Sequence, residues 1–163
     1  MQIIEYEDRF LDDVKNLLVE LEEYIIKIDG DELDQLHSEY KDKMALLDLK
    51  TIKDNSGKCY LAIQNNMVIG LIMGYVRAYD EFDYLDYKCP KSGVISEFIV
   101  SEKVRSKGIG KQLINKMEEY FKSIDCEYIL LECFAYNKSA INFYKNQGYH
   151  TRMLINIKSY KMI

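Results

Sequence analysis

The segment from Ser101 to Lys116 holds the residues of this sequence that are best suited to binding an anion. It follows an apolar run typical of a buried strand and precedes a segment with helical periodicity. Gly108 and Gly110 carry no side chain that would keep a ligand from the backbone. Several N–H groups at the helix N-terminus can therefore point at one anion, assisted by the helix dipole. With five basic residues and one acidic residue, the segment is predicted to bind a phosphate or pyrophosphate.

Two other glycine-loop families fit this segment less well. A Walker-type loop needs a serine or threonine hydroxyl for magnesium after its glycine and lysine, but Gln112 follows Gly110 and Lys111. The dinucleotide-binding fingerprint needs a third glycine, where this sequence has Leu113. That fingerprint also belongs to the first βα turn of a domain, whereas this loop lies past the middle of the chain. A tight turn with solvated lysines is the remaining alternative to an anion site.

A second motif begins at Asn137, 27 residues after Gly110. It reads Asn137-Lys-Ser-Ala-Ile-Asn-Phe-Tyr144-Lys-Asn-Gln-Gly148-Tyr149. Together with the loop Arg105-x-x-Gly108-x-Gly110, this motif closely resembles the GNAT superfamily of acetyl-CoA-dependent N-acetyltransferases. The resemblance is strong over residues 94–149, whereas residues 1–93 match only in the order of their elements.

The resemblance implies how acetyl-CoA, the acetyl donor, binds. Its pyrophosphate is expected on the loop formed by Arg105, Ser106, Lys107, Gly108, Ile109, Gly110 and Lys111. Its pantetheine arm is expected to pair like an extra strand with the backbone of Phe98, Ile99 and Val100. In the family, the residues matched by Asn137 and Tyr144 contact the cofactor, and the tyrosine commonly protonates the departing thiolate. No metal ion is expected.

The resemblance also implies the reaction, which is transfer of the acetyl group to a primary amine of a small molecule or a protein by direct attack in a ternary complex. A primary amine is protonated at neutral pH, so a base must remove a proton before it attacks the thioester. Glu132 matches a position that serves as base in some protein N-terminal acetyltransferases, whereas Glu97 lies among apolar residues that would raise its pKa. Both candidates stay open, and the alternative function is a non-catalytic acyl-CoA-binding module.

The surrounding residues predict the elements that position these motifs. Apolar strands are expected at 94–100 and 128–134, with a helix between them, which gives a βαβ unit with a parallel strand pair. The other expected elements are a strand at 3–6, helices over 10–28, 33–47 and 139–147, a hairpin of strands 59–63 and 67–79, and closing strands in 149–162. The order is mixed α/β. The resemblance adds the GNAT fold, a mostly antiparallel central sheet splayed at a parallel pair and flanked by helices.

Composition limits the remaining possibilities. A chain of 163 residues that is 48% hydrophobic is expected to form a single domain over 1–163, and its four cysteines show no disulfide or metal spacing. The net charge of -5 disfavours nucleic acid as a partner. No N-terminal stretch reads as a signal peptide or membrane span, so a soluble cytoplasmic protein is expected, and the resemblance suggests a monomer or homodimer.

The segment Asp80–Tyr87 differs from the rest of the chain, because four acidic residues alternate with aromatic ones. It is predicted to be part of a long surface loop. Its acidic side chains suggest attraction of a cationic amine acceptor, and the alternative is a solvated run of charges.

Overall fold

The computed structural model describes residues 1–105 and 108–160, which belong to two compact units, 1–132 and 133–163. The strands of the first unit are β1 (Gln2–Glu5), β2 (Lys58–Gln64), β3 (Met67–Val76), β4 (Ser92–Val100) and β5 (Tyr128–Leu131). Its helices are α1 (Leu11–Ile28), α2 (Tyr40–Asp54), α3 (Asp83–Asp86) and α4 (Ile109–Ser123), with short 3-10 helices at Asp8–Phe10 and Glu102–Val104. The second unit contains α5 (Lys138–Asn146).

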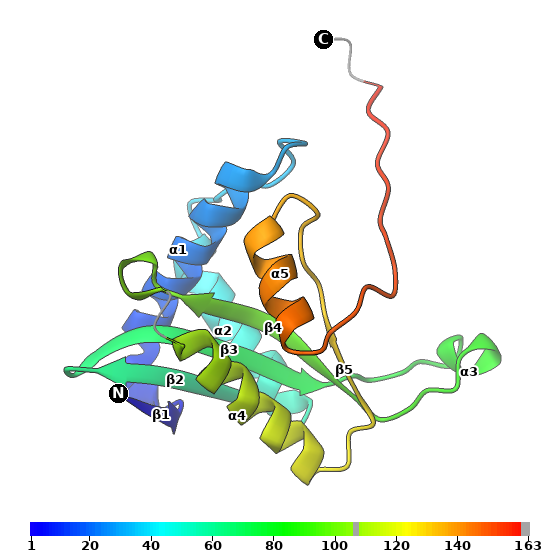
Figure 1. Cartoon of the computed structure of the whole chain (residues 1–163), viewed down its shortest axis with the longest axis horizontal. Helices are drawn as coiled ribbons and strands as arrows, with labels where there is room; N and C mark the ends of the chain where they lie inside the picture. The colour runs from blue at the N-terminus through cyan, green and yellow to red at the C-terminus, as the bar shows by residue number, and fades with distance from the viewer. Residues whose placement is uncertain (106–107, 161–163) are drawn as a thin grey trace. The chain divides into compact units, whose positions relative to one another are not determined.

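The sheet of the first unit has the strand order β1-β2-β3-β4-β5 (Figure 1). Each neighbouring pair from β1 to β4 is antiparallel, and β4 and β5 are parallel. The βαβ unit β4-α4-β5 is therefore confirmed, and so is the mixed α/β class with a mostly antiparallel sheet. β5 ends at Leu131, which is earlier than the predicted strand end at Phe134.

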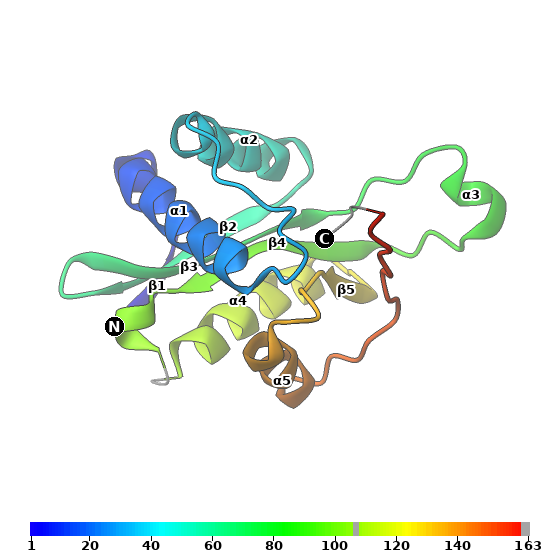
Figure 2. The ribbon, with the colours of Figure 1, turned by 90° about the horizontal axis from the view of Figure 1, so that it is seen from above.

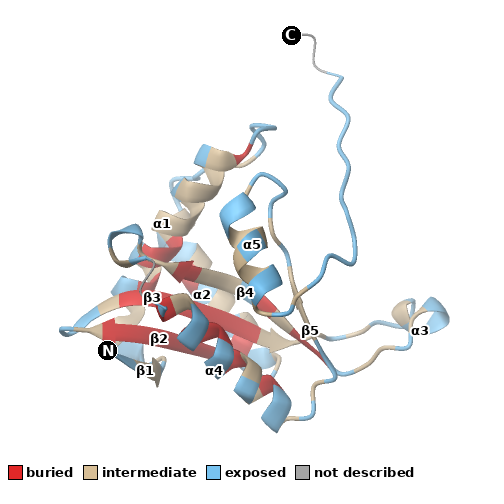
Figure 3. Ribbon diagram, viewed as in Figure 1, coloured by how far each residue is buried: buried red, intermediate tan, exposed pale blue. Residues whose placement is uncertain are grey.

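Helices cover both faces of this sheet (Figure 2). α1 and α2 lie on one face, where one hydrophobic cluster joins both helices to β2, β3 and β4. Figure 3 shows that the buried residues concentrate in the sheet and on the helix faces turned to it. The members of this cluster include Val14, Leu17, Leu18, Ala45, Ile52, Leu61, Leu71, Met73 and Ile99. The sheet is thus held in place between two apolar layers.

The opposite face is covered by α4, whose buried residues are Ile109, Leu113, Ile114, Met117 and Phe121. The Phe121 ring, fully buried, lies directly against the backbone of the sheet. A Cβ added at Gly93 would meet ring carbons of Phe121 at 2.6 Å, and one added at Gly74 would meet the same ring at 2.9 Å. Glycine at these two strand positions is what allows α4 to approach the sheet so closely.

The second helix was predicted over 33–47, and that prediction is wrong at its start. α2 begins at Tyr40, and Leu33 is 60% exposed. The reason is local: the carboxylate of Asp29 accepts hydrogen bonds from the backbone N–H of Asp31, Leu33 and Asp34, at 3.0, 2.6 and 3.1 Å. A carboxylate that holds three N–H groups in a turn competes with a helix for the same backbone donors.

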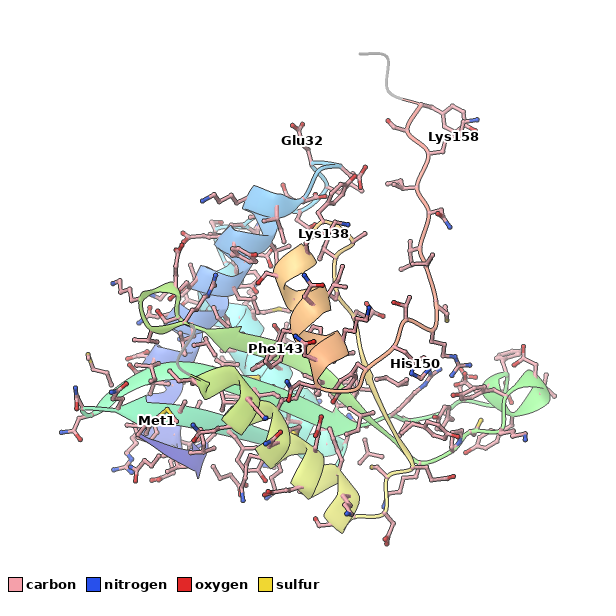
Figure 4. The ribbon with its side chains drawn as sticks, viewed as in Figure 1. Met1, Glu32, Lys138, Phe143, His150 and Lys158 are labelled. Carbon is pink, nitrogen blue, oxygen red and sulfur yellow. The ribbon has the colours of Figure 1, made fainter. Side chains whose placement is uncertain are left out.

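The second unit consists of α5 and an extended terminal segment, drawn from His150 to Lys158 in Figure 4. The predicted closing strands in 149–162 are not found in the described residues up to 160. Met153, Leu154 and Ile155 are 76%, 76% and 89% exposed. Three apolar residues in a row lack the alternation of a half-buried strand, and apolar character alone does not supply a hydrogen-bonding partner. Residues 161 and 162 lie outside the described part of the chain.

Candidate active site

β4 extends beyond its parallel neighbour. The pairing of β5 with β4 begins at Tyr128 opposite Ser92 and ends at Leu131 opposite Ile95. On its other edge β4 stays paired with β3 as far as Val100, which lies opposite Gly70. Phe98, Ile99 and Val100 therefore lie where β4 has already passed the end of β5. These are the residues expected to bind the pantetheine arm.

A β-bulge interrupts the ladder between β3 and β4 just before this stretch. Met73 lies opposite Glu97 and Gly74 lies opposite Ile95, so Ser96 is an extra residue in β4. A bulge bends its strand and changes the direction of nearby groups, and it is common next to active sites. The bulge thus falls next to Glu97, one of the two candidate bases.

The glycine loop follows β4 and leads into α4. Gly108 has φ +75°, in the left-handed region that favours glycine, and nothing lies within 4 Å of an added Cβ. The conformation, and not a lack of space, therefore calls for glycine here. Arg105 turns back on the strand: its Nε donates a 3.0 Å hydrogen bond to the carbonyl oxygen of Val100, and its guanidinium lies 5.0 Å from the Tyr24 ring centroid. Ser106 and Lys107 lie outside the described residues.

The N-terminus of α4 has the properties expected of an anion site. Gly108 is its N-cap, and no side chain of the described residues caps the helix there. The first turn contains no acidic residue and includes Ile109, Gly110 and Lys111. Its backbone N–H groups and the positive end of the helix dipole are therefore directed toward the loop, which fits a phosphate or pyrophosphate.

Glu97 lies on the face of β4 that α1 and α2 cover. It is two residues before Ile99, a member of the hydrophobic cluster on that face, and residues two apart in a strand share a face. Burial, followed by the charges of Asp48 and Glu22, raises its pKa to about 8. The carboxyl group is thus held near the pH at which it exchanges a proton most readily. Burial was the cause expected from the sequence; the two carboxylates were not.

Asp48 of α2 and Glu22 of α1 are the site residues that sequence reasoning missed. Burial raises the pKa of Asp48 to about 6, and burial followed by the charge of Asp34 raises that of Glu22. The hydroxyl of Tyr40 donates a hydrogen bond to Glu22. A signal was present, since Asp48 follows the buried Ala45 by three residues and Glu22 follows Leu18 by four. Those spacings place both acids on buried helix faces.

Glu132, the other candidate base, has a different environment. It comes directly after β5 and is exposed. It is also not among the groups that raise the pKa of Glu97. The first unit therefore groups Glu97 with Asp48 and Glu22, and it does not bring Glu132 into that group.

The second unit carries the other two predicted residues. Asn137 is the N-cap of α5, and its Oδ1 accepts a 3.0 Å hydrogen bond from the N–H of Ala140. The ring of Tyr144 packs edge-on against Phe143 and Tyr149, with centroids 5.5 and 5.9 Å apart. Burial, followed by the Cys133 thiol, raises the pKa of Tyr144. Its hydroxyl thus stays protonated at neutral pH, as a proton donor requires.

The predicted acidic loop is the connection between β3 and β4 and contains the single-turn helix α3. Its acids are partly engaged within the loop itself: Asp80 accepts hydrogen bonds from the N–H of Phe82 and Asp83, and Asp83 pairs with Arg77 at 3.2 Å. At the same time Phe82, Tyr84 and Leu85 are exposed. The four acids are therefore not a uniform charged surface, and at least two of them shape the loop.

A mostly antiparallel sheet with one parallel pair, followed by a glycine loop that leads into a helix, is the arrangement expected of an acyltransferase from the resemblance of the sequence. Within that class, the chain belongs to the Acetyltransferase (GNAT) family, whose model matches residues 17–149. That match runs across both compact units.

Curated relatives match the chain over shorter regions. GCN5-related N-acetyltransferase 4 of Arabidopsis thaliana, a chloroplastic protein, is 35% identical over 88 residues, which are 50% of this chain and 30% of that protein. N-alpha-acetyltransferase 30 of Xenopus laevis is 31% identical over 91 residues, 56% of this chain and 31% of that protein. An uncharacterized N-acetyltransferase of Methanocaldococcus jannaschii is 32% identical over 97 residues, which are 59% of this chain and 54% of that protein. The matched region thus spans less than two thirds of each of these relatives.

Solved structures extend the likeness to the whole chain at the level of the fold. The tetramutant of the BH1408 protein from Bacillus halodurans superposes with a TM-score of 0.80 at 16% identity, covering 98% of this chain and all of that one. Aminoglycoside N-acetyltransferase AAC(6')-Iy in complex with CoA has a TM-score of 0.69 at 12% identity, and the superposition covers 99% of this chain and 100% of that one. The same enzyme has been solved with a bisubstrate analogue that joins CoA to acetylneamine.

Neither a membrane-spanning helix nor a metal-binding cluster is found among the described residues. No helix in 1–105 or 108–160 is long and apolar enough to cross a membrane. Over the same residues, no three His, Cys, Asp or Glu side chains are grouped so that they could hold a metal ion.

Proposed function

We propose that the protein is an N-acetyltransferase that transfers the acetyl group of acetyl-CoA to a primary amine by direct attack in a ternary complex. The observation that carries this proposal is the position of Glu97. This half-buried carboxyl group, with its pKa raised to about 8, lies beside the bulge of β4, just before the stretch where β4 passes the end of β5. Membership of the GNAT family supports the same reaction.

The cofactor would bind along β4 and across the glycine loop. The pantetheine arm pairs with the backbone of Phe98, Ile99 and Val100 as an added strand would. The pyrophosphate lies at the N-terminus of α4, where Gly108 and the N–H groups of the first turn meet it. Because the family model spans 17–149, we also propose that the two compact units act as one acetyltransferase domain.

Glu97 is the base in this proposal. The acceptor arrives as an ammonium ion, and the carboxylate of Glu97 accepts its proton directly or through one water. The neutral nitrogen then attacks the thioester carbon and forms the new C–N bond. Backbone N–H groups at the bulge of β4 polarise the carbonyl oxygen and stabilise the negative charge it gains. Glu97 is preferred to Glu132 because Glu132 is exposed.

Tyr144 completes the reaction. As the tetrahedral intermediate collapses, the C–S bond breaks and the sulfur leaves as a thiolate. The hydroxyl of Tyr144 donates a proton to that sulfur, and the tyrosine regains a proton from solvent. Asn137 supports this arrangement by capping α5, the helix that carries Tyr144.

The experiment that tests the proposal follows the release of free thiol from acetyl-CoA in the presence of a panel of primary amines. We expect at least one amine to give release above the rate of hydrolysis. Glu97→Gln is expected to lower kcat/KM about a hundredfold or more, the usual contribution of a general base. The matched variant Glu132→Gln is expected to have little effect. The reverse order would assign the base to Glu132. Binding of acetyl-CoA without thiol release for any amine would favour an acyl-CoA-binding module instead.

A further inference from the structure

The segment between β4 and the glycine loop is held by side chains of α1. Glu20 and Tyr24 lie one turn apart on this helix, so their side chains share one face. The Oε1 atom of Glu20 accepts a 2.8 Å hydrogen bond from the backbone N–H of Glu102. The guanidinium group of Arg105 lies over the ring of Tyr24, 5.0 Å from its centroid. One face of α1 thus contacts both ends of the segment 102–105.

The hydrogen bond of Glu20 meets a need of the backbone at Glu102. This residue opens the 3-10 helix Glu102–Val104, and the first N–H groups of a helix have no partner inside it. Ser101, the N-cap residue, makes no side-chain hydrogen bond to this helix. Glu20 therefore does from α1, 82 positions away in the sequence, what an N-cap side chain does locally.

Arg105 makes its backbone contact at the edge of β4 that would bind the pantetheine arm. The N–H of Ser101 donates a 3.0 Å hydrogen bond to the carbonyl oxygen of Ile69 in β3. Hydrogen-bonded residues alternate along an antiparallel strand, so the carbonyl group of Val100 points away from β3, to the edge that β5 leaves open. The Nε atom of Arg105 donates to that oxygen at 3.0 Å. Arg105 thus joins the open edge of β4 to the ring of Tyr24.

These contacts fix the chain just before the glycine loop. Three residues after Arg105, Gly108 is the N-cap of α4, where the pyrophosphate would bind. A loop whose entry is already held loses less conformational freedom when it binds a ligand, so such contacts lower the Kd of the ligand. The position of α1 therefore bears on cofactor binding, although Glu20 and Tyr24 lie outside the motifs that indicated the cofactor site.

We propose that Glu20 and Tyr24 are positioning residues of the cofactor site, which act through the backbone of Glu102 and the side chain of Arg105. Their role is to hold the entry of the glycine loop in the geometry that binds the pyrophosphate of CoA. The inference rests on the proposed function, because the cofactor site is part of that proposal. It adds that a helix distant in the sequence sets part of the affinity for CoA.

The test of Glu20 measures the Kd of CoA by isothermal titration calorimetry, well below the unfolding temperature of each variant. Glu20→Ala removes the acceptor and is expected to raise the Kd about three- to tenfold, part of what a hydrogen bond to a charged group contributes. Glu20→Gln keeps an oxygen that accepts the same hydrogen bond, so its Kd should not rise. Glu20→Gln also separates the hydrogen bond from the removal of a negative charge near an anionic ligand. The matched control Glu23→Ala changes an exposed acid on the same helix and should leave the Kd unchanged.

Tyr24 is tested together with Arg105. Tyr24→Leu removes the ring and is expected to raise the Kd of CoA about threefold, whereas Tyr24→Phe keeps a ring and should restore most of the affinity. If Tyr24 acts through Arg105, Tyr24→Leu should have little further effect in the Arg105→Met variant. In steady-state kinetics the KM for acetyl-CoA should rise while kcat stays within about twofold of the wild type, a split that general damage to the fold would not give.

Four results would overturn the inference. They are an unchanged Kd in Glu20→Ala or in Tyr24→Leu, an equal rise in Glu20→Gln, fully additive effects of Tyr24→Leu and Arg105→Met, and a wild-type protein that does not bind CoA. Binding of CoA without thiol release for any amine would overturn the proposed function alone, since the comparison of Kd values needs no reaction. Thermal unfolding of each variant confirms that the Kd values come from folded protein.

Discussion

The carboxyl group of Glu97 shows how three elements set the strength of one base. An isolated glutamate would be ionised at neutral pH and would be a weak proton acceptor. Burial under α1 and α2 removes water from the charged form, and the carboxylates of Asp48 and Glu22 oppose a further negative charge. The result is a group that can both take a proton from an ammonium ion and release it near neutral pH.

The first prediction at this scale concerns the pH dependence of the reaction. The charge of Asp48 raises the pKa of Glu97, so Asp48→Asn should lower it and move the ascending limb of kcat/KM to lower pH. The limb is measured from kcat/KM against pH with one amine acceptor. Asp42→Asn serves as control, because Asp42 is exposed and pairs with Lys15. An unshifted limb in Asp48→Asn would mean that Glu97 is not the group that titrates.

Tyr144 gives the second residue-scale prediction. Tyr144→Phe keeps the ring that packs against Phe143 and Tyr149 and removes only the hydroxyl. We expect kcat to fall about tenfold or more, the effect of losing a general acid, while the Kd for acetyl-CoA changes little. Steady-state kinetics and calorimetric titration of the cofactor measure the two quantities separately. An unchanged kcat would assign the proton to water or to another side chain.

Among the elements, the contact between β4 and α4 links the core to the cofactor loop. The glycine loop begins where β4 ends and finishes where α4 starts, so its position depends on how α4 is seated. That seating depends on the ring of Phe121 lying against the backbone at Gly93 and Gly74. Phe121 thus helps to hold the helix that would bind the pyrophosphate against the strand that carries Glu97.

Gly93→Ala tests this contact. The new methyl group would stand 2.6 Å from a fully buried ring, so the ring or the strand must shift. We expect the free energy of unfolding to fall by about 1–3 kcal/mol, as is typical of overpacking. Denaturant unfolding measures it. Gly93→Ala should lower the free energy of unfolding less in the Phe121→Leu variant than in the wild type, because the smaller side chain leaves room for the new methyl group. Strictly additive effects would show that the two positions are not in contact.

On the scale of the whole molecule, the raised pKa values of Glu97 and Asp48 make stability depend on pH. The pKa of Glu97 is raised to about 8 and that of Asp48 to about 6, both above the values of exposed carboxyl groups. A group with a raised pKa contributes stability that is fully present below its unfolded pKa and is lost as the pH rises through its folded pKa. Glu97 and Asp48 thus favour the fold in acid and disfavour it in mild alkali.

This dependence gives the last prediction. Asp48→Asn and Glu97→Gln each remove a partly buried charge, so their Tm should exceed that of the wild type by an amount that grows from about pH 5 to about pH 9. Each kcal/mol gained should raise Tm by about 2–4 °C for a chain of this size. Differential scanning calorimetry across this pH range measures the difference, and Asp42→Asn should show none that varies with pH. A Tm difference between variant and wild type that shrinks as the pH rises would contradict the raised pKa values of Glu97 and Asp48.

The sequence by itself determined the features that depend on neighbouring residues. The strand at Ser92–Val100, the helix after it and the parallel pair follow from apolar periodicity. The hairpin follows from Asn65 and Asn66, which both adopt positive φ between β2 and β3. The glycine and asparagine motifs were enough to indicate the family, because both serve local backbone requirements. Gly108 adopts a left-handed conformation, and Asn137 caps a helix.

Only the tertiary structure decided which side chains share a site. The start of α2 was missed because three N–H groups bind one carboxylate of Asp29, an arrangement that periodicity does not encode. The closing strands were expected from apolar residues that have no strand partner among those described up to 160. The raised pKa of Glu97 comes from burial and from the charges of Asp48 and Glu22, which are distant in the sequence and act on Glu97 only in the folded chain. Local pattern sets the elements, whereas burial and proximity, which depend on distant parts of the chain, set the chemistry.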